Sequence, residues 1–187
     1  MECSFALVGR GYVIVASDTV AARSIVKMKS DEDKIKTLGP HLLMSYSGEP
    51  GDTVHFAEPA AAASWIRRAI ADSIRSRSPY AVNVLVGGFD TSAAAVAESG
   101  ADVGGIPKLY WIDNYGTLAE VPFAAHGYGA YFALSLLDRY HNPEGTLEEG
   151  LATLKRCIDE TALRFIVGGT SYKVKVVDKD GVREVSL

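Results

Sequence analysis

The residues of this sequence that could take part in chemistry lie close to its N-terminus. Residues 2–9 and 12–17 are two short runs rich in β-formers, and Arg10-Gly11 between them predicts a β-hairpin. The second run ends at Asp18, and Lys34 follows a charged turn. A lysine beside a nucleophile lowers the cost of the charge that develops there, and an aspartate can hold that lysine in place. The same pair could also be a structural salt bridge that closes the strand end.

Three other residues are weaker candidates. His126 could be a general base, but no motif such as G-x-S-x-G accompanies it, so packing or hydrogen bonding is favoured. Cys3 and Cys157 have neither metal-ligand spacing nor a disulfide-rich pattern, and we expect reduced core thiols. The histidines are scattered without zinc spacing, and the glycines of GYGAYF match a phosphate-binding loop only loosely. No metal and no cofactor are predicted.

These residues must be positioned by strands and helices that the sequence predicts in separate blocks. Strands are expected over residues 24–28, 34–38, 42–47, 80–89, 108–112, 117–121, 172–177 and 182–185, in addition to the first hairpin. Helices are expected over residues 52–58, 59–75 and 129–140, and in a segment that Thr146 and Glu149 open with a capping box. The apolar face of the helix over 59–75 is predicted to be Trp65, Ile66, Ala69, Ile70 and Ile74.

Residues 91–107 differ from the rest because they contain few large side chains. We expect this segment to be a mobile, poorly packed surface excursion.

Segregated blocks of strands and helices with hairpin connections predict an α+β protein with antiparallel sheets. Two blocks of amphipathic helices need two sheet faces to bury against. The expected architecture is therefore a four-layer α-β-β-α sandwich.

The composition indicates one globular domain and gives no support for binding to nucleic acid or to a membrane. A chain of 187 residues with 48% apolar and 22% charged residues fits one globular domain over residues 1–187. Nineteen basic and twenty-three acidic residues give a net charge of −4, which provides no attraction for nucleic acid or an anionic membrane. There is no positively charged leader and no apolar run long enough for a membrane span, so we expect an intracellular protein.

Several motifs together resemble the β-type subunits of the 20S proteasome, and among them the non-catalytic β4 type. They are GYVIVASD, DKIKTL, SGEPGDT, RSRSPYAVNVLVGGFD, PFAAHGYGAYFALSLLDRY and RFIVGGTSYKVKVVDKDGV, and they follow the family's order over nearly the whole chain. The resemblance implies an N-terminal-nucleophile hydrolase fold of the four-layer type. In the catalytic members, a threonine at the start of the first strand attacks the peptide, and its own amine helps as base.

The resemblance also implies what each position would do. Asp18 and Lys34 match the supporting aspartate and lysine, but the nucleophilic threonine falls on Glu2, which has no hydroxyl or thiol. Three further supporting positions fall on residues that lack the required groups, namely Ala130, Phe165 and Gly168. No residue is therefore predicted to be catalytic, and Asp18 and Lys34 are interpreted as scaffold.

The expected function is that of a non-catalytic structural subunit in ATP- and ubiquitin-dependent protein degradation in the cytoplasm and nucleus. Its expected partners are the other β subunits of a seven-membered ring, the opposing β-ring and the α-ring. One alternative is an active N-terminal-nucleophile hydrolase that uses Cys3 or Ser4 after trimming, although a one-residue slip along a strand turns a side chain to the other face. The other is a stand-alone α+β binding domain.

One segment departs from the family pattern. In β4-type subunits, about 18 further residues follow the position of Glu58. They continue the first helix and form the chain reversal that leads into the second helix. Here Pro59 follows directly, and a helix over 52–58 would be only about 10 Å long. We therefore predict that residues are absent from the printed sequence, so that the Cα atoms of Glu58 and Pro59 lie much further apart than about 3.8 Å.

Overall fold

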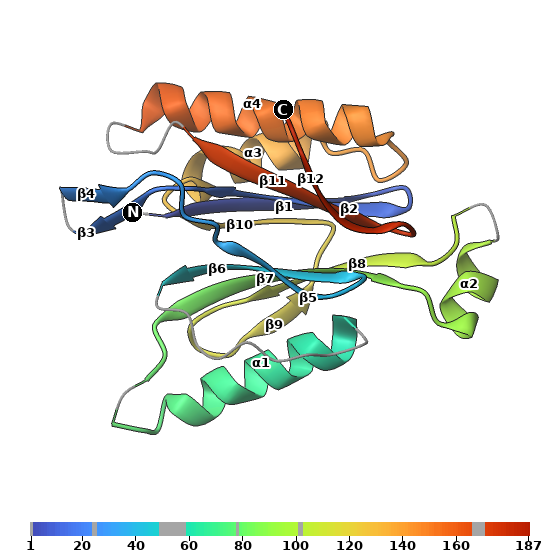
Figure 1. Ribbon diagram of the computed structural model, residues 1–187, viewed down its shortest axis with the longest axis horizontal. Coiled ribbons are helices and arrows are strands. Elements are labelled where there is room, and N and C mark those ends of the chain that lie inside the picture. Colours follow the sequence, from blue (N-terminus) through green and yellow to red (C-terminus); the bar gives the residue numbers. More distant parts are fainter. Residues whose placement is uncertain (1, 24–25, 49–58, 78, 101–102, 166–170) are drawn as a thin grey trace.

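The computed structural model describes residues 2–23, 26–48, 59–77, 79–100, 103–165 and 171–187 (Figure 1). Two five-stranded antiparallel sheets pack face to face. Helices α3 (Ala130–Tyr140) and α4 (Leu147–Arg164) cover one sheet, and α1 (Pro59–Ser73) covers the other. The predicted α+β fold, a four-layer α-β-β-α sandwich with antiparallel sheets, is confirmed.

The sheet under α3 and α4 is built from both ends of the chain. Its strand order is β10-β1-β2-β11-β12, with bounds Phe123–Gly127, Cys3–Gly9, Tyr12–Asp18, Tyr172–Asp178 and Gly181–Val185. The first hairpin is joined across Arg10-Gly11 as predicted, and Gly9 lies opposite Tyr12 and Ser4 opposite Ser17. Gly11 supplies the positive φ of 79° that the tight turn needs. The closing hairpin of β11 and β12 is also as predicted.

The sheet over α1 is built from the middle of the chain. Its strand order is β5-β6-β7-β8-β9, with bounds Ile35–Gly39, Leu42–Gly48, Val82–Asp90, Ile106–Ile112 and Leu118–Glu120. The turn between β8 and β9 is held by Asp113, whose Oδ1 accepts hydrogen bonds from the backbone N–H groups of Tyr115 (2.9 Å) and Thr117 (2.8 Å). A separate two-stranded sheet is formed by β3 (Ala21–Arg23) and β4 (Val26–Lys29). It follows β2 in the chain and projects away from the sandwich in Figure 1.

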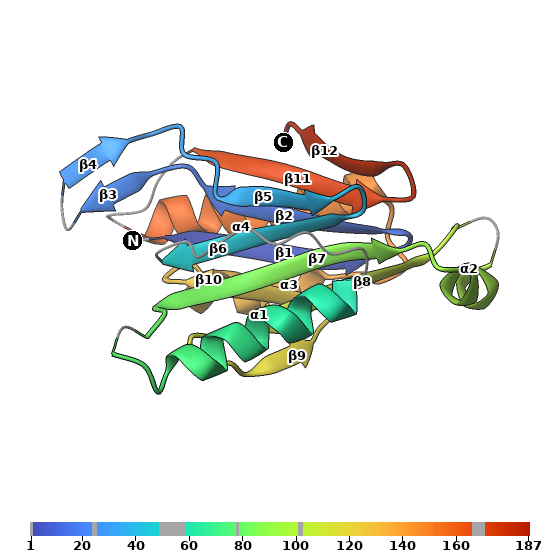
Figure 2. The same cartoon turned by 60° about the horizontal axis from the view of Figure 1, so that its bottom comes forward.

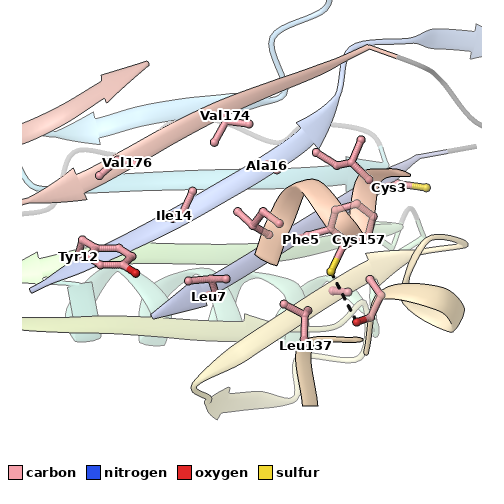
Figure 3. Packing of buried hydrophobic residues seen from close by; sticks show 14 residues of the cluster. Cys3, Phe5, Leu7, Tyr12, Ile14, Ala16, Leu137, Cys157, Val174 and Val176 are labelled. Carbon is pink, nitrogen blue, oxygen red and sulfur yellow. Dashed lines mark hydrogen bonds between the residues drawn. The ribbon is translucent and has the colours of Figure 1, made fainter. Parts of the chain in front are cut away.

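Three apolar clusters fill the three spaces between the four layers. Side chains alternate along a strand, so Phe5 and Leu7 of β1 pack with Leu137 and Leu154 under the helices, as Figure 3 shows for part of this cluster. The cluster between the sheets contains Ala6, Val13, Val15, Leu43 and Leu85. The cluster under α1 contains Leu42, Ala63, Ile70, Val84 and Ile112.

The predicted buried face of α1 is partly wrong. Ile70 is buried as expected, with Ala62 and Ala63, but Trp65 and Ile74 have 43% and 41% of their surface exposed. Pro59 lies so close to Gly88 of β7 that a Cβ at Gly88 would collide with its ring, and the small residues Ala62 and Ala63 are fully buried against the same sheet. The larger side chains lie at the margin of the contact.

The described part of residues 91–107 contains a helix that was not predicted, α2 (Ala93–Ser99), which is capped by Ser92 and lies at the side of the sandwich (Figure 2). Only Ala95 of α2 is buried, so the helix is poorly packed as expected. The expectation is wrong at the other end of the segment, where Val103 packs against the cluster between the sheets and Ile106 and Pro107 belong to β8. The mobility of the segment stays a prediction. Strands β3 and β10 were also not predicted. The expected helix over 52–58 and the distance between Glu58 and Pro59 lie outside the described residues. Figure 2 shows α1 lying over the second sheet and running roughly along β7.

Candidate functional site

The carboxylate of Asp18 ties the start of β1 to the end of β2. Asp18 is the last residue of β2, and only 1% of its surface is exposed. Its Oδ1 accepts a hydrogen bond from the backbone N–H of Cys3 (2.8 Å), and its Oδ2 accepts one from the N–H of Val20 (3.1 Å). These bonds satisfy two backbone donors that the strand ends would otherwise leave without partners.

Lys34 brings the second sheet to the same point. It directly precedes β5, and its side chain is 2% exposed. Its Nζ lies 2.9 Å from Oδ2 of Asp18, 2.8 Å from the backbone oxygen of Val20 and 3.4 Å from Oε1 of Glu2. The structure therefore brings together all three residues that the sequence placed at this site.

The contacts of Lys34 decide what the site can do. The ammonium group of Lys34 donates hydrogen bonds to Asp18 and to the backbone oxygen of Val20, and it forms an ion pair with Glu2 at 3.4 Å. One positive charge lies between two carboxylates, of which Asp18 is fully buried and Glu2 is 29% exposed. The arrangement satisfies a buried charge, and Glu2 offers no hydroxyl or thiol that Lys34 could assist.

Cys3 is the nearest potential nucleophile, and its surroundings work against that role. The thiol is buried in the cluster under the helices, and its Sγ accepts a hydrogen bond from the backbone N–H of Gly129 (3.2 Å). Burial raises the pKa of Cys3, with the negative charge of Asp18 adding to the effect and the bond from Gly129 opposing it. Cys157 is also free and buried, and burial raises its pKa to about 12. Both cysteines are the buried thiols that the sequence predicted.

The glycines of the HGYG segment have a structural explanation. Gly127 has a φ of 77°, and a Cβ at this position would collide with the backbone oxygen of Glu2. A Cβ at Gly129 would meet the ring of Phe5 and the thiol of Cys3. These glycines let the turn before α3 approach the start of β1, and no phosphate-binding loop is needed to explain them.

His126 packs between the sheets, as the sequence favoured. Its ring stacks on Trp111, with 5.1 Å between centroids, and its Nε2 lies 3.2 Å from the backbone oxygen of Val84. Burial lowers the pKa of His126, and the hydrogen bond to Val84 opposes this only in part. A neutral, enclosed imidazole of this kind holds the two sheets together.

The other supporting positions carry apolar side chains. Ala130 begins α3 and packs against the cluster under the helices. Phe165 ends α4 and stacks on Tyr128, with 5.4 Å between ring centroids, and it also approaches Phe132 at 6.5 Å. Gly168 lies outside the described residues. At Phe165, where the resemblance implies an aspartate, the protein has an aromatic cluster.

Sequence reasoning missed a second charged cluster beside the first. Asp33 accepts hydrogen bonds at Oδ2 from the Nζ atoms of Lys175 (2.9 Å) and Lys173 (3.3 Å), and at Oδ1 from the N–H of Ile35 (3.0 Å). Burial acts to raise the pKa of Asp33, but these bonds outweigh it, and the pKa lies below the ordinary value. The cluster joins the segment before β5 to β11 and so connects the two sheets at their margin.

Among the described residues, no group of histidine, cysteine, aspartate and glutamate side chains could hold a metal ion. Within the same part of the chain, no helix is long and apolar enough to cross a membrane.

Comparison with known proteins adds to this geometry. A family model described as "Proteasome subunit" matches residues 2–177. The chain is 38% identical to "Probable proteasome subunit beta type-4" of Schizosaccharomyces pombe, with all of both chains covered. It is 42% identical to "Proteasome subunit beta type-4" of Saccharomyces cerevisiae, over 92% of this chain and 91% of the relative. It is 40% identical to "Proteasome subunit beta type-2-B" of Arabidopsis thaliana, over 98% and 95%.

The alignment with the S. pombe relative extends over 205 positions, although this chain has 187 residues. Some of its positions therefore have no counterpart here. The predicted gap after Glu58 stays a prediction.

Proposed function

The chain belongs to the proteasome subunit family, and on that premise we propose that it is a non-catalytic β-type subunit of the 20S core. It occupies a place in a seven-membered β-ring, between two neighbouring β subunits, and contacts the opposing β-ring and the α-ring. Its contribution to ATP- and ubiquitin-dependent degradation in the cytoplasm and nucleus is geometric. It completes the wall of the chamber in which catalytic neighbours cut.

The observation that carries this proposal is the contact between Lys34 and Glu2. The lysine that would assist a nucleophile lies 3.4 Å from a carboxylate at the nucleophile's position, and its other two contacts are Asp18 and a backbone oxygen. A carboxylate that is ion-paired in this way stabilises a charge and does not attack a peptide carbonyl. The aromatic cluster at Phe165 agrees with the same interpretation.

The alternative of an active hydrolase is disfavoured by the surroundings of its two candidate nucleophiles, Cys3 and Ser4. Cys3 and Ser4 are both buried within β1, and burial raises the pKa of the Cys3 thiol, which keeps it in its unreactive form. A stand-alone binding domain is disfavoured because the family match extends over nearly the whole chain.

The test replaces Lys34 with methionine in the assembled particle. We expect each peptidase activity, measured per assembled particle, to stay within about twofold of the wild type, because no nucleophile of this chain depends on the ammonium group. Lys29→Met, at an exposed position, is the matched control. Loss of one peptidase activity in particles that have assembled normally would refute the proposal.

Mass spectrometry of the mature N-terminus gives an independent measurement. Retention of Met1, or exposure of Glu2 by ordinary methionine removal, supports the structural role. A terminus at Cys3 or Ser4 supports the hydrolase.

A further inference from the structure

The interior between the two sheets changes from apolar to polar along β6. Leu43 belongs to the apolar cluster between the sheets, and Ser45 and Ser47 follow it on the same face, because side chains alternate along a strand. Ser45 has no exposed surface, and Ser47 is 6% exposed. One face of β6 therefore carries two buried hydroxyl groups at the end that lies near Lys34.

Neither of these hydroxyl groups is satisfied by the protein. In the part of the chain that the structure describes, the Oγ atoms of Ser45 and Ser47 have no hydrogen-bond partner. A buried hydroxyl that has left bulk water without gaining a new bond destabilises a fold, and folded proteins rarely leave such groups unsatisfied. Two unsatisfied hydroxyls, two residues apart on one strand, point to a shared partner.

β2 supplies a third buried serine to the same interior. A Cβ added at Gly87 of β7 would meet Leu43 of β6 and Val13 of β2, each at 3.1 Å, so this face of β2 looks onto β6 and β7. Ser17 lies on the same face of β2, further along the strand, and it is 2% exposed.

β2 and β6 run from that contact toward the same end of the sandwich. β2 ends at Asp18, which is bonded to Lys34. The backbone oxygen of Lys34 accepts a hydrogen bond from the N–H of Tyr46 in β6. Ser17 precedes Asp18 and Ser45 precedes Tyr46, so the two serines approach the same region of the interface from opposite sheets.

The small side chains in this region leave space between the sheets. Ser45 lies in one row with Ile35 and Leu85, which pair with it on the neighbouring strands and are fully buried in the cluster between the sheets. Packed sheets lie about 10 Å apart, and large side chains fill that distance from both sides. Serines fill less of it. A space lined by hydroxyl groups suits an ordered water molecule.

We propose that Ser45 and Ser47 bind an internal water molecule between the two sheets, with Ser17 on the opposite side of the site. Residues two apart on a strand have Cα atoms about 6.6 Å apart, and a water with hydrogen bonds of about 2.8 Å joins oxygen atoms up to about 5.6 Å apart. Both hydroxyls reach one water when they turn toward each other. The inference concerns the fold of the chain and does not rest on the proposed function.

Water is the ligand that the chemistry of this site selects. A hydroxyl group donates one hydrogen bond and accepts others, and water can satisfy both roles at once. The site lies beside the buried pair of Asp18 and Lys34, so the water would add a polar neighbour where two charges have been removed from solvent. It would act as a structural ligand that holds β6 against β2.

A high-resolution crystal structure of the full-length chain, alone or within an assembled particle, tests the site directly. We expect density for one water molecule about 2.8 Å from the Oγ atoms of both Ser45 and Ser47. The same crystals under xenon pressure should show no xenon there, because xenon enters dry apolar cavities. Xenon density at this point, or side chains that fill the space completely, would overturn the proposal.

Thermal unfolding of Ser45→Ala and Ser47→Ala gives a second test, because the two possibilities predict opposite signs. If a water satisfies the hydroxyls, each substitution removes a hydrogen bond, and Tm should fall by about 2–4 °C. If the hydroxyls have no partner, alanine removes a buried polar group and Tm should rise. A rise, or no change, in either variant would contradict the proposal.

The double variant shows whether the two serines share one water. Because the first substitution already weakens the binding of that water, Ser45→Ala with Ser47→Ala should lower Tm by less than the sum of the single variants. Fully additive losses would mean two independent partners and would also overturn the proposal.

Two further serines give the scale of the effect. Ser73→Ala is the matched control, since the buried Ser73 Oγ donates to the backbone oxygen of Ile70 (2.7 Å) and accepts from the N–H of Tyr80 (3.1 Å). It should lower Tm by an amount similar to that for Ser45→Ala. Ser186→Ala, at an exposed position, should leave Tm unchanged.

Discussion

Two regions that the family resemblance places around one catalytic centre have opposite characters. At the strand ends, Asp18 and Lys34 form a buried ion pair that also bonds the backbone of Cys3 and Val20. At the end of α4, Phe165 stacks on Tyr128 in an aromatic cluster. The charged pair has structural work at this position, whereas nothing in the second region requires a charge. Asp18 and Lys34 are present although Glu2 replaces the nucleophile, and at the same time they bond the backbone. Supporting residues of a catalytic site can therefore be kept for a structural reason.

Removal of one member of the Asp18–Lys34 ion pair should have the largest effect on stability. Lys34→Met leaves the Asp18 carboxylate buried without its ammonium partner, and we expect the free energy of unfolding to fall by about 3 kcal/mol. The double variant Asp18→Asn with Lys34→Met should lose less than the sum of the two single variants, because the fully buried carboxylate is then removed together with its ammonium partner. Urea denaturation of all three variants measures both effects. Additive losses would mean that the two side chains act independently.

The aromatic region should give a smaller effect. Phe165 is only partly buried, so we expect Phe165→Ala to lower the free energy of unfolding by about 1–2 kcal/mol through loss of contact with Tyr128 and Phe132. Leu163→Ala is the control, because Leu163 is 74% exposed on the same helix and should change stability very little. Equal losses at the two positions would show that the aromatic cluster contributes nothing of its own.

The smallest expected effect concerns Asp33, which lies next to Lys34 but at the margin of the sandwich. Its folded-state pKa lies below the ordinary value of 3.8, so its contribution is present above the unfolded pKa and is lost as the pH falls through the folded pKa. Asp33→Asn should therefore lower the melting temperature at neutral pH, by the equivalent of about 0.5 kcal/mol for a partly exposed group. The difference from the wild type should close below about pH 4.

Asp31→Asn serves as the control for the pH series, because the Asp31 side chain is 82% exposed. A difference between Asp33→Asn and the wild type that persists unchanged into acid would show that the carboxylate's charge is not the cause.

The sequence predicted the hairpins and the capped helix well because their signals are local. Arg10-Gly11 fixes the first turn, and Thr146 with Glu149 forms the capping box, with both of its hydrogen bonds present. Strand β10 was missed because its residues are small and show no clear alternation of apolar and polar side chains. It is a strand because β1 offers it a partner, which no local pattern reveals.

Some contacts of the candidate site could be predicted from the sequence, and others could not. Asp18 and Lys34 could be placed together only through the family resemblance, and the structure joins them. The contacts of Asp33 could not be foreseen, since Lys173 and Lys175 lie about 140 residues further along the chain. The exposure of Trp65 and Ile74 was also hidden, because helical spacing marks a stripe of apolar residues but does not say which of its edges meets the sheet.

The strand order β10-β1-β2-β11-β12 has a consequence for the growing chain on the ribosome. β2 is complete at Asp18, but its partner β11 begins only at Tyr172, near the end of synthesis. The sheet of the middle segment, β5 to β9, can pair as soon as it emerges. Throughout that time the free edge of β2, rich in valine and isoleucine, can pair with any other strand it meets. We expect the unfinished chain to need a chaperone more than the finished subunit does.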